Sequence, residues 1–341
     1  MGQLGGRGRR LRADRRRTSK QGPSRSLRLF ASQTERRLLL AGTALVSTLA
    51  AAMPAPASAQ QAVFIPASPL SVTRTNNLDC IFPGPCALIN TILPFAGINF
   101  TNHGDFLALG AGILTNTPFA FSPITITNTG DIATAGPLAA GIFANVVGPF
   151  SPIKIVNRGD LATAGFGAAG IAATSLLFGS NNISITNSGD IATIGSAAFG
   201  IYALTTGSNS DVSITNSGGL STRGYNADGI YGGTYARNSN LSIVNSGDML
   251  TRDVEAEGIY ATTRGTNSKL SVVNSGNITT RGGYADGIDA FGYGTNNDVR
   301  VVNSGDIITT GFYTVGIFAA TSKANSSVTI VNSGSIEAGG V

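Results

Sequence analysis

Carboxylates are the side chains in this 341-residue sequence whose spacing could support chemistry. Asp286 and Asp289 lie three residues apart, and Glu257 stands 29 residues before Asp286. Two carboxylates on opposite sides of a glycosidic bond can hydrolyse a polysaccharide, and clustered carboxylates also bind Ca²⁺. These acids follow a repeating pattern instead of interrupting it, and the only histidine, His103, has no evident partner. We therefore expect no enzyme, no cofactor and no metal, with a polysaccharide-active enzyme as the alternative.

Arginines and acids recur in register over three successive copies of a repeat. The arginines are Arg223, Arg252 and Arg281, and the acids that follow them by five residues are Asp228, Glu257 and Asp286. Opposite charges that flank the same turn indicate either surface ion pairs or a polar strip that binds a glycan or a matrix protein.

An aromatic column is expected on the outer side of one predicted strand. Successive copies carry at this position Phe143, Ala172, Tyr202, Tyr231, Tyr260, Asp289 and Phe318. The rings could contact sugars or a partner, or they could only stabilise the sheet. We take Tyr202, Tyr231, Tyr260 and Phe318, together with the arginine and acid columns, as the candidate contact surface.

These candidates all lie within a tandem repeat. The stretch ITNSGDIATIG (185–195) has close relatives along the chain, and each copy contains an Asn that is followed two residues later by Gly. Most copies are 29 residues apart, and their asparagines are Asn102, Asn128, Asn157, Asn187, Asn216, Asn245, Asn274, Asn303 and Asn332. A fixed period of this length indicates a repeat protein in which each unit packs on its neighbours.

Apolar residues alternate within each copy, at four and two residues before the Asn and again after it. Period-two alternation, β-branched residues and frequent Gly predict three short strands per copy and no helix, and the spacing differs from that of leucine-rich repeats. We predict an all-β fold, a right-handed parallel β-helix of about nine 29-residue turns. The asparagines from Asn128 onward should form a ladder of side-chain hydrogen bonds.

Residues 1–59 have the organisation of a signal peptide. A region with twelve Lys/Arg and two Asp/Glu contains an apolar run at 38–52, and Ala57-Ser58-Ala59 predicts cleavage between Ala59 and Gln60. Residues 60–341 carry eleven Lys/Arg and sixteen Asp/Glu. A nucleic-acid partner would need a basic face, so we expect none. The protein is predicted to be exported.

Two cysteines, Cys80 and Cys86, flank a Pro-Gly-Pro turn in CIFPGPC. A nearby pair in an exported protein predicts a disulfide, because the turn residues bring the two side chains together. We predict that residues 60–97 form an N-terminal cap tied by this bond, and that residues 98–341 form the β-helix and end within a repeat.

The copies ITNSGDIATIGSAAFGIYA (185–203) and VVNSGNITTRGGYADGIDA (272–290) resemble the passenger repeats of bacterial autotransporters. The resemblance covers about residues 98–341 and the long basic signal. It implies type V secretion through the periplasm to the cell surface or the medium, and a role as an adhesin or structural contact module toward a glycan or a host or matrix protein.

We expect this chain to lack the C-terminal outer-membrane β-barrel of that family. The resemblance therefore leads us to expect a separate translocator, or self-association through the open C-terminal edge, where unpaired strands would be exposed. A truncated relic without independent function is a further alternative.

Overall fold

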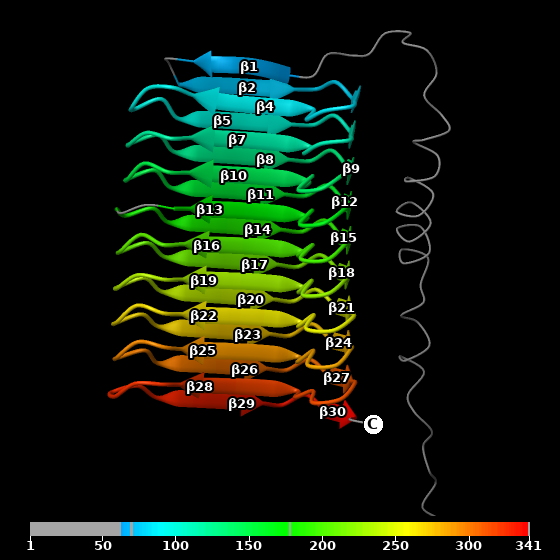
Figure 1. Ribbon diagram of the computed structural model, residues 1–341, viewed down its shortest axis with the longest axis vertical. Helices are drawn as coiled ribbons and strands as arrows, with labels where there is room; N and C mark the ends of the chain where they lie inside the picture. Colours follow the sequence, from blue (N-terminus) through cyan, green and yellow to red (C-terminus); the bar gives the residue numbers. More distant parts are fainter. Residues whose placement is uncertain (1–62, 69–70, 177–178, 340–341) are drawn as a thin grey trace, which may run out of the picture.

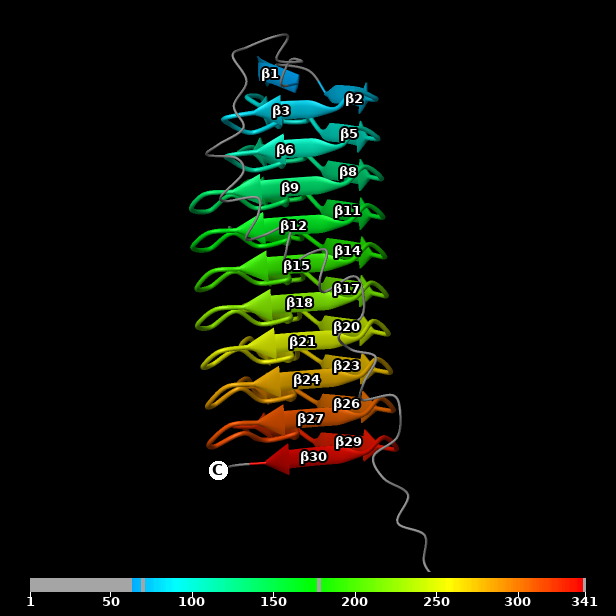
Figure 2. The same cartoon turned by 90° about the vertical axis from the view of Figure 1, so that its right-hand side faces the viewer.

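The computed structural model describes residues 63–68, 71–176 and 179–339, which build a parallel β-helix (Figure 1). The chain passes through three sheets in turn and advances along the axis with a right-handed sense (Figures 1 and 2). This confirms the predicted fold class. No helix in the described part of the chain has the length and apolar character of a membrane span. The predicted signal, with its apolar run 38–52 and the bond between Ala59 and Gln60, lies outside the described residues.

Among the described residues, each sheet contains ten strands, one from every turn. The first sheet stacks β1 (Val63–Ser68), β4 (Ala87–Thr91), β7 (Ile113–Thr117), β10 (Ile142–Val146), β13 (Ile171–Ser175), β16 (Ile201–Thr205), β19 (Ile230–Thr234), β22 (Ile259–Thr263), β25 (Ile288–Gly292) and β28 (Ile317–Thr321). The second sheet stacks β2 (Val72–Asn76), β5 (Ile98–Asn102), β8 (Ile124–Asn128), β11 (Ile153–Asn157), β14 (Ile183–Asn187), β17 (Val212–Asn216), β20 (Leu241–Asn245), β23 (Leu270–Asn274), β26 (Val299–Asn303) and β29 (Val328–Asn332). The third sheet stacks β3 (Cys80–Phe82), β6 (Phe106–Ala108), β9 (Ile132–Ala135), β12 (Leu161–Ala164), β15 (Ile191–Ile194), β18 (Leu220–Arg223), β21 (Met249–Arg252), β24 (Ile278–Arg281), β27 (Ile307–Thr310) and β30 (Ile336–Gly339).

Like residues pair in register between successive turns. Ile153 pairs with Ile183 and Asn157 with Asn187, and the same columns continue in both directions. Because side chains alternate across a strand, every second residue points into the β-helix. The inward columns form one continuous core, in which residues such as Ile142 have no exposed surface. Each fully buried Ile contributes about 2 kcal/mol to folding.

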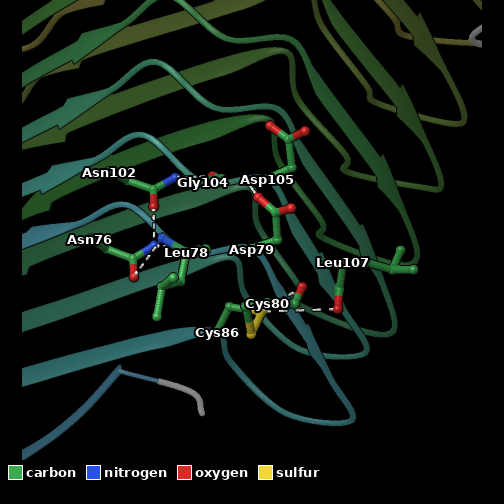
Figure 3. The surroundings of a disulfide bond; sticks show 9 residues. All are labelled: Asn76, Leu78, Asp79, Cys80, Cys86, Asn102, Gly104, Asp105 and Leu107. Carbon is green, nitrogen blue, oxygen red and sulfur yellow. Dashed lines mark hydrogen bonds between the residues drawn. A yellow bond between two sulfur atoms is a disulfide. The ribbon is translucent and has the colours of Figure 1, made fainter. Parts of the chain in front are cut away.

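The column of asparagines forms a buried ladder at the corner between the second and third sheets. Asn187 Nδ2 donates to Asn216 Oδ1 and to Gly189 O, both at 2.7 Å. The same pair of hydrogen bonds recurs from turn to turn, so each amide is satisfied without water. The ladder begins earlier than predicted, because Asn76 Nδ2 donates to Asn102 Oδ1 at 2.8 Å (Figure 3).

A second ladder lies on the surface, three residues after most ladder asparagines, and Gly219 interrupts it. Asp160 Oδ1 accepts the backbone N–H of Asp190 at 2.8 Å, and Asp131 Oδ1 accepts that of Asp160 at 2.8 Å. We call this the acid ladder; its members are Asp79, Asp105, Asp131, Asp160, Asp190, Asp248, Asn277 and Asp306. Each carboxylate therefore ties one turn to the next.

The segment expected as a separate cap continues the same sheets. Within its described part, β1 to β4 pair in parallel with later strands, so β1 to β3 form the first turn of the β-helix and β4 begins the second. Cys80 and Cys86 are joined, with their Cα atoms 5.9 Å apart (Figure 3). Both are buried, and Cys80 aligns with the apolar column that continues as Phe106 and Ile132. The disulfide thus takes the place of apolar packing in this first turn.

A buried threonine closes the turn that follows each third-sheet strand from β9 to β24. Thr251 Oγ1 donates to Ala256 O and Thr280 Oγ1 to Ala285 O, both at 2.6 Å. We call this connection from the third to the first sheet the corner turn. Its tip projects beyond the sheets (Figure 2, left).

Candidate functional site

The predicted aromatic column lies on the outer face of the first sheet. Tyr202, Tyr231 and Tyr260 project from β16, β19 and β22 and pair in register. The ring centroids of Tyr202 and Tyr231 are 4.9 Å apart, and those of Tyr231 and Tyr260 are 5.2 Å apart, with interplanar angles of 22° and 19°. Phe199 tilts against Tyr202 at 5.2 Å. Three of the four predicted aromatic side chains therefore form one stack, which we call the tyrosine stack.

Stacking occupies the faces of these rings, so mainly their edges and hydroxyls can meet a partner. Burial raises the pKa of Tyr202 and of Tyr260 to about 12 and raises the pKa of Tyr231 further, so all three phenols stay neutral. The hydroxyls of Tyr231 and Tyr235 lie 2.8 Å apart in a hydrogen bond. A sugar needs an open ring face for stacking, and within the tyrosine stack that face is largely taken.

Asp289 interrupts the column directly after Tyr260. It pairs with Tyr260 on one side and with Phe318, the fourth predicted aromatic residue, on the other. Only 9% of Asp289 is exposed, and its Oδ1 has no hydrogen-bond partner among the described residues. Burial, followed by repulsion from Asp286 and Glu257, raises the pKa of Asp289 to about 7. This carboxyl group is therefore partly protonated near neutral pH.

The acid column lies just before the first-sheet strands and is less exposed than predicted. Asp228 is buried, and its Oδ1 accepts the backbone N–H of Glu257 at 3.0 Å. Asp286 Oδ1 likewise accepts the backbone N–H of Val315 at 2.7 Å. Burial raises the pKa of Asp228 well above its usual range, with further contributions from a side-chain hydrogen bond with Glu257 and repulsion by it. These acids link neighbouring turns through the backbone, as the acid ladder does.

The arginine column stands on the other side of the corner turn. Arg223, Arg252 and Arg281 end β18, β21 and β24 and pair in register. Arg223 and Arg281 are exposed, whereas the nearest acid column begins with the buried Asp228. The structure therefore aligns each column along the β-helix, with the arginines at the ends of third-sheet strands and the acids at the far end of the corner turn that follows.

A cation–aromatic column adjoins the tyrosine stack and was not predicted. The Arg264 guanidinium lies 4.2 Å from the ring centroid of Tyr235 and 5.8 Å from that of Tyr293. These three residues follow one another at the 29-residue period. The sequence signal was therefore present, because Arg between two Tyr in register favours cation–π contacts.

Exposed apolar side chains gather at the corner turns and were also missed. Tyr313 is 76% exposed and Leu138 71%, and the rings of Tyr284 and Tyr313 stack at 5.3 Å. We call this surface the corner ridge; it consists of Leu138, Phe166, Tyr225, Val254, Tyr284, Phe312 and Tyr313. Several of these residues have positive φ, such as 57° at Leu138 and 56° at Tyr313. Sequence periodicity fails here because residue types in the turn vary from copy to copy.

A separate stack of phenylalanines lies at the turns between the first and second sheets. Phe95 and Phe121 stack at 4.9 Å, and Phe121 and Phe150 stack at 5.0 Å. All three are exposed. Later turns carry asparagines in this position, where Asn296 Nδ2 donates to Asn267 Oδ1 at 2.9 Å. This phenylalanine stack is a second apolar surface, at a different corner from the corner ridge.

Catalytic and metal-binding arrangements are limited in the described ranges. His103 is exposed, and its Nδ1 lies 2.7 Å from Thr129 Oγ1. This contact lacks the third group that orients the base in a catalytic nucleophile–base arrangement. Across the same ranges, no group of three or more His, Cys, Asp or Glu side chains is arranged to hold a metal ion.

Comparisons with protein-family models, with curated proteins and with solved structures find no significant match to this chain.

Proposed function

We propose that this protein is exported and works by contact, as a passenger-like adhesin or structural module at the cell surface or in the medium. The basic N-terminus with its apolar run and small-residue cleavage site supports export. The parallel β-helix and the resemblance of its copies to autotransporter passenger repeats support the passenger-like role.

The corner ridge is the observation on which the contact function depends. Large apolar side chains at one corner of most turns from Leu138 to Tyr313 form an exposed apolar surface, which is typical of interaction sites. Tyr225, Tyr284 and Tyr313 within it combine an apolar ring with a hydrogen-bonding hydroxyl, as at many protein interfaces. We favour a host or matrix protein over a glycan as the partner, because the tyrosine stack offers few open ring faces.

The test is binding of the purified chain to immobilised matrix proteins. Replacing Tyr225, Tyr284 and Tyr313 together by Ser should weaken binding at least about tenfold, because aromatic anchors dominate interface energies.

The matched control for this test replaces Phe95, Phe121 and Phe150 by Ser. This removes three exposed rings from the other corner and should leave binding unchanged. Equal binding by both variants and the parent chain would contradict the ridge as contact surface.

Export is tested separately by determining the N-terminus of the protein recovered from the periplasm, membrane and medium. We expect a mature chain that begins at Gln60. A full-length chain retained in the cytoplasm would contradict export while leaving the contact test valid.

A polysaccharide-active enzyme is the second candidate, favoured by one observation. Asp289 is a buried carboxyl group with a pKa raised to about 7, as a general acid requires, and Asp286 and Glu257 are near enough to influence it. Screening the parent chain against bacterial and plant polysaccharides tests this role. Any turnover should disappear in Asp289→Asn, and a complete absence of turnover would exclude the candidate.

A further inference from the structure

Asp289 occupies a place where the surrounding pattern calls for an aromatic ring. Tyr202, Tyr231 and Tyr260 stack in successive turns, and Phe318 resumes the column after Asp289. Strands lie about 4.8 Å apart, so Tyr260 and Phe318 are separated by roughly 9.6 Å along the axis. An aspartate is much shorter than a tyrosine. The side of Tyr260 that faces the next turn therefore meets a carboxylate in place of a ring.

The neighbours of Asp289 on this outer face include an aromatic ring and a buried threonine. Phe291 follows Asp289 on the same side of β25, and its centroid lies 5.1 Å from that of Phe318 and 5.3 Å from that of Tyr293. Thr262, which pairs with Phe291, is buried, and its Oγ1 has no hydrogen-bond partner in the described structure. Asp289 Oδ1 likewise has no hydrogen-bond partner among the described residues. Two buried oxygen atoms on adjacent strands thus remain without a donor.

Two acids lie close enough to Asp289 to act on its carboxyl group. Asp286 and Glu257 both repel the Asp289 carboxylate and raise its pKa. Asp289 in turn raises the pKa of Asp228. The nearby cation, Arg264, lies against the rings of Tyr235 and Tyr293. A buried carboxylate beside other acids and aromatic rings is an environment in which a cation gains from both the charge and the ring faces.

We propose that the outer face around Asp289 binds an organic ammonium group, with Asp289 accepting its N–H donors and Tyr260, Phe291 and Phe318 contacting its alkyl carbons. The group is either a free alkylamine or the lysine side chain of a polypeptide, which share this chemistry. A divalent metal fits less well, because Asp228 and Asp286 already use a carboxylate oxygen to accept a backbone N–H. The site extends beyond the contact function and does not depend on the corner ridge.

The test is a titration of the full chain with n-butylammonium, followed by calorimetry and by tyrosine fluorescence. The chain has no Trp, so Tyr emission is not masked. We expect n-butylammonium to bind saturably at one site. We expect no binding of n-butanol, which has the same carbon chain without the charge. Asp289→Asn should weaken binding at least tenfold and Tyr260→Leu at least threefold.

The control variant is Asp298→Asn, which removes an exposed acid elsewhere on the surface and should bind as the parent does. The circular dichroism spectrum of each variant verifies its fold, and Phe318→Leu provides a second variant if Tyr260→Leu is poorly folded. An affinity unchanged in Asp289→Asn, or no saturable binding by the parent chain, would overturn the proposal. A lysine-containing peptide that binds more tightly than n-butylammonium identifies a polypeptide as the source, and equal affinity identifies a free amine.

Discussion

A glycine stands two residues after each ladder asparagine from Gly104 onward, and the reason is steric. A Cβ on Gly218 would lie 2.0 Å from Gly189 O in the preceding turn, and a Cβ on Gly130 would lie 2.1 Å from Gly104 O. Backbone atoms cannot move aside as a flexible side chain can. The turns stack so closely at this corner that there is no space for a Cβ, and only glycine fits.

Two adjacent glycines allow a matched test of this packing. We expect Gly218→Ala to lower the free energy of unfolding by about 2–3 kcal/mol, because the added methyl group forces two turns apart. Gly219→Ala should leave stability unchanged or slightly raised, because the nearest atom to its Cβ is Asp190 Oδ1 at 3.2 Å. Urea denaturation followed by circular dichroism measures both. Similar losses in both variants would contradict the steric explanation.

Asp289 should make the protein less stable as the pH rises from 5 to 8. Its folded-state pKa of about 7 lies above the unfolded value, so the folded state holds the proton more tightly. The stabilisation is full below the unfolded pKa and is lost as the pH rises through the folded pKa. The loss between pH 5 and 8 should be about 2–3 kcal/mol.

The Asp289→Asn variant should show a smaller pH dependence in urea denaturation over the same range. Asp298→Asn is the control, because hydrogen bonds from Ser327 lower the pKa of Asp298. That contribution is lost only as the pH falls through the lowered pKa, outside this range. A pH dependence that persists in Asp289→Asn would assign the effect to another group.

At the level of single residues, columns with a fixed residue type were predictable and exceptions were not. The Asn, Ile and Gly columns follow from period and side-chain size. Asn76 was missed because Leu78 stands where later copies have Gly, so the copy did not match the pattern. Asp228 and Asp289 were expected on the surface because they are charged. Their burial depends on neighbours from adjacent turns, which sequence spacing alone does not rank.

The acid ladder shows how an element can combine a favourable hydrogen bond with an unfavourable charge. Asp160 binds the next turn through the N–H of Asp190. Burial raises the pKa of Asp160, and repulsion from Asp190 and Asp131 adds to this rise, although the hydrogen bond opposes it. Asn277 supplies the same acceptor to Asp306 N at 3.0 Å without a charge. The hydrogen bond, and not the charge, therefore holds the turns together.

Asp160→Asn should raise stability at low ionic strength by a few tenths of a kcal/mol, because it keeps the acceptor and removes repulsion. Added NaCl should stabilise the parent chain more than this variant, because salt screens exposed charges. Asp160→Ala is the control and should be destabilised, since it removes the acceptor. Thermal unfolding in 10 and 500 mM NaCl gives the comparison, and a lower stability of Asp160→Asn in both would contradict it.

Strands were predictable as elements, but their full extent was not. The alternation of apolar residues located the strands of each regular copy, for example β14, β15 and β16. The sequence predicts a separate cap at 60–97 because its Pro-Gly-Pro turn and cysteines hide the repeat. The structure shows that β1 to β4 obey the same pairing, since backbone hydrogen bonds place little restriction on side-chain type.

The described part of the chain is one stack of turns, whose stability depends on contacts between neighbouring turns. Ten strands per sheet span roughly 43 Å at the usual strand spacing. Each turn contacts the one before and the one after, so the length is not fixed by any long-range contact.

Deletion of one complete turn, residues 217–245, should therefore yield a folded and shorter β-helix. The deletion joins Asn216 to Ser246 and leaves every column in register. We expect a β-type circular dichroism spectrum and a cooperative thermal transition. Deletion of residues 217–230 shifts the later strands out of register and should abolish both. Loss of folding in the complete-turn deletion would contradict independence of the turns.

Leu78 determines at which end of the β-helix further turns can be added. It occupies the glycine position of the first described turn, and its side chain is 62% exposed. In later turns, a Cβ at this position would clash with a backbone carbonyl of the preceding turn. The side of each turn that faces the following turn has no such clash. Duplication of a repeat could therefore lengthen the rod anywhere downstream of Leu78. To place a turn ahead of it, evolution or an engineer would first have to change Leu78 to glycine.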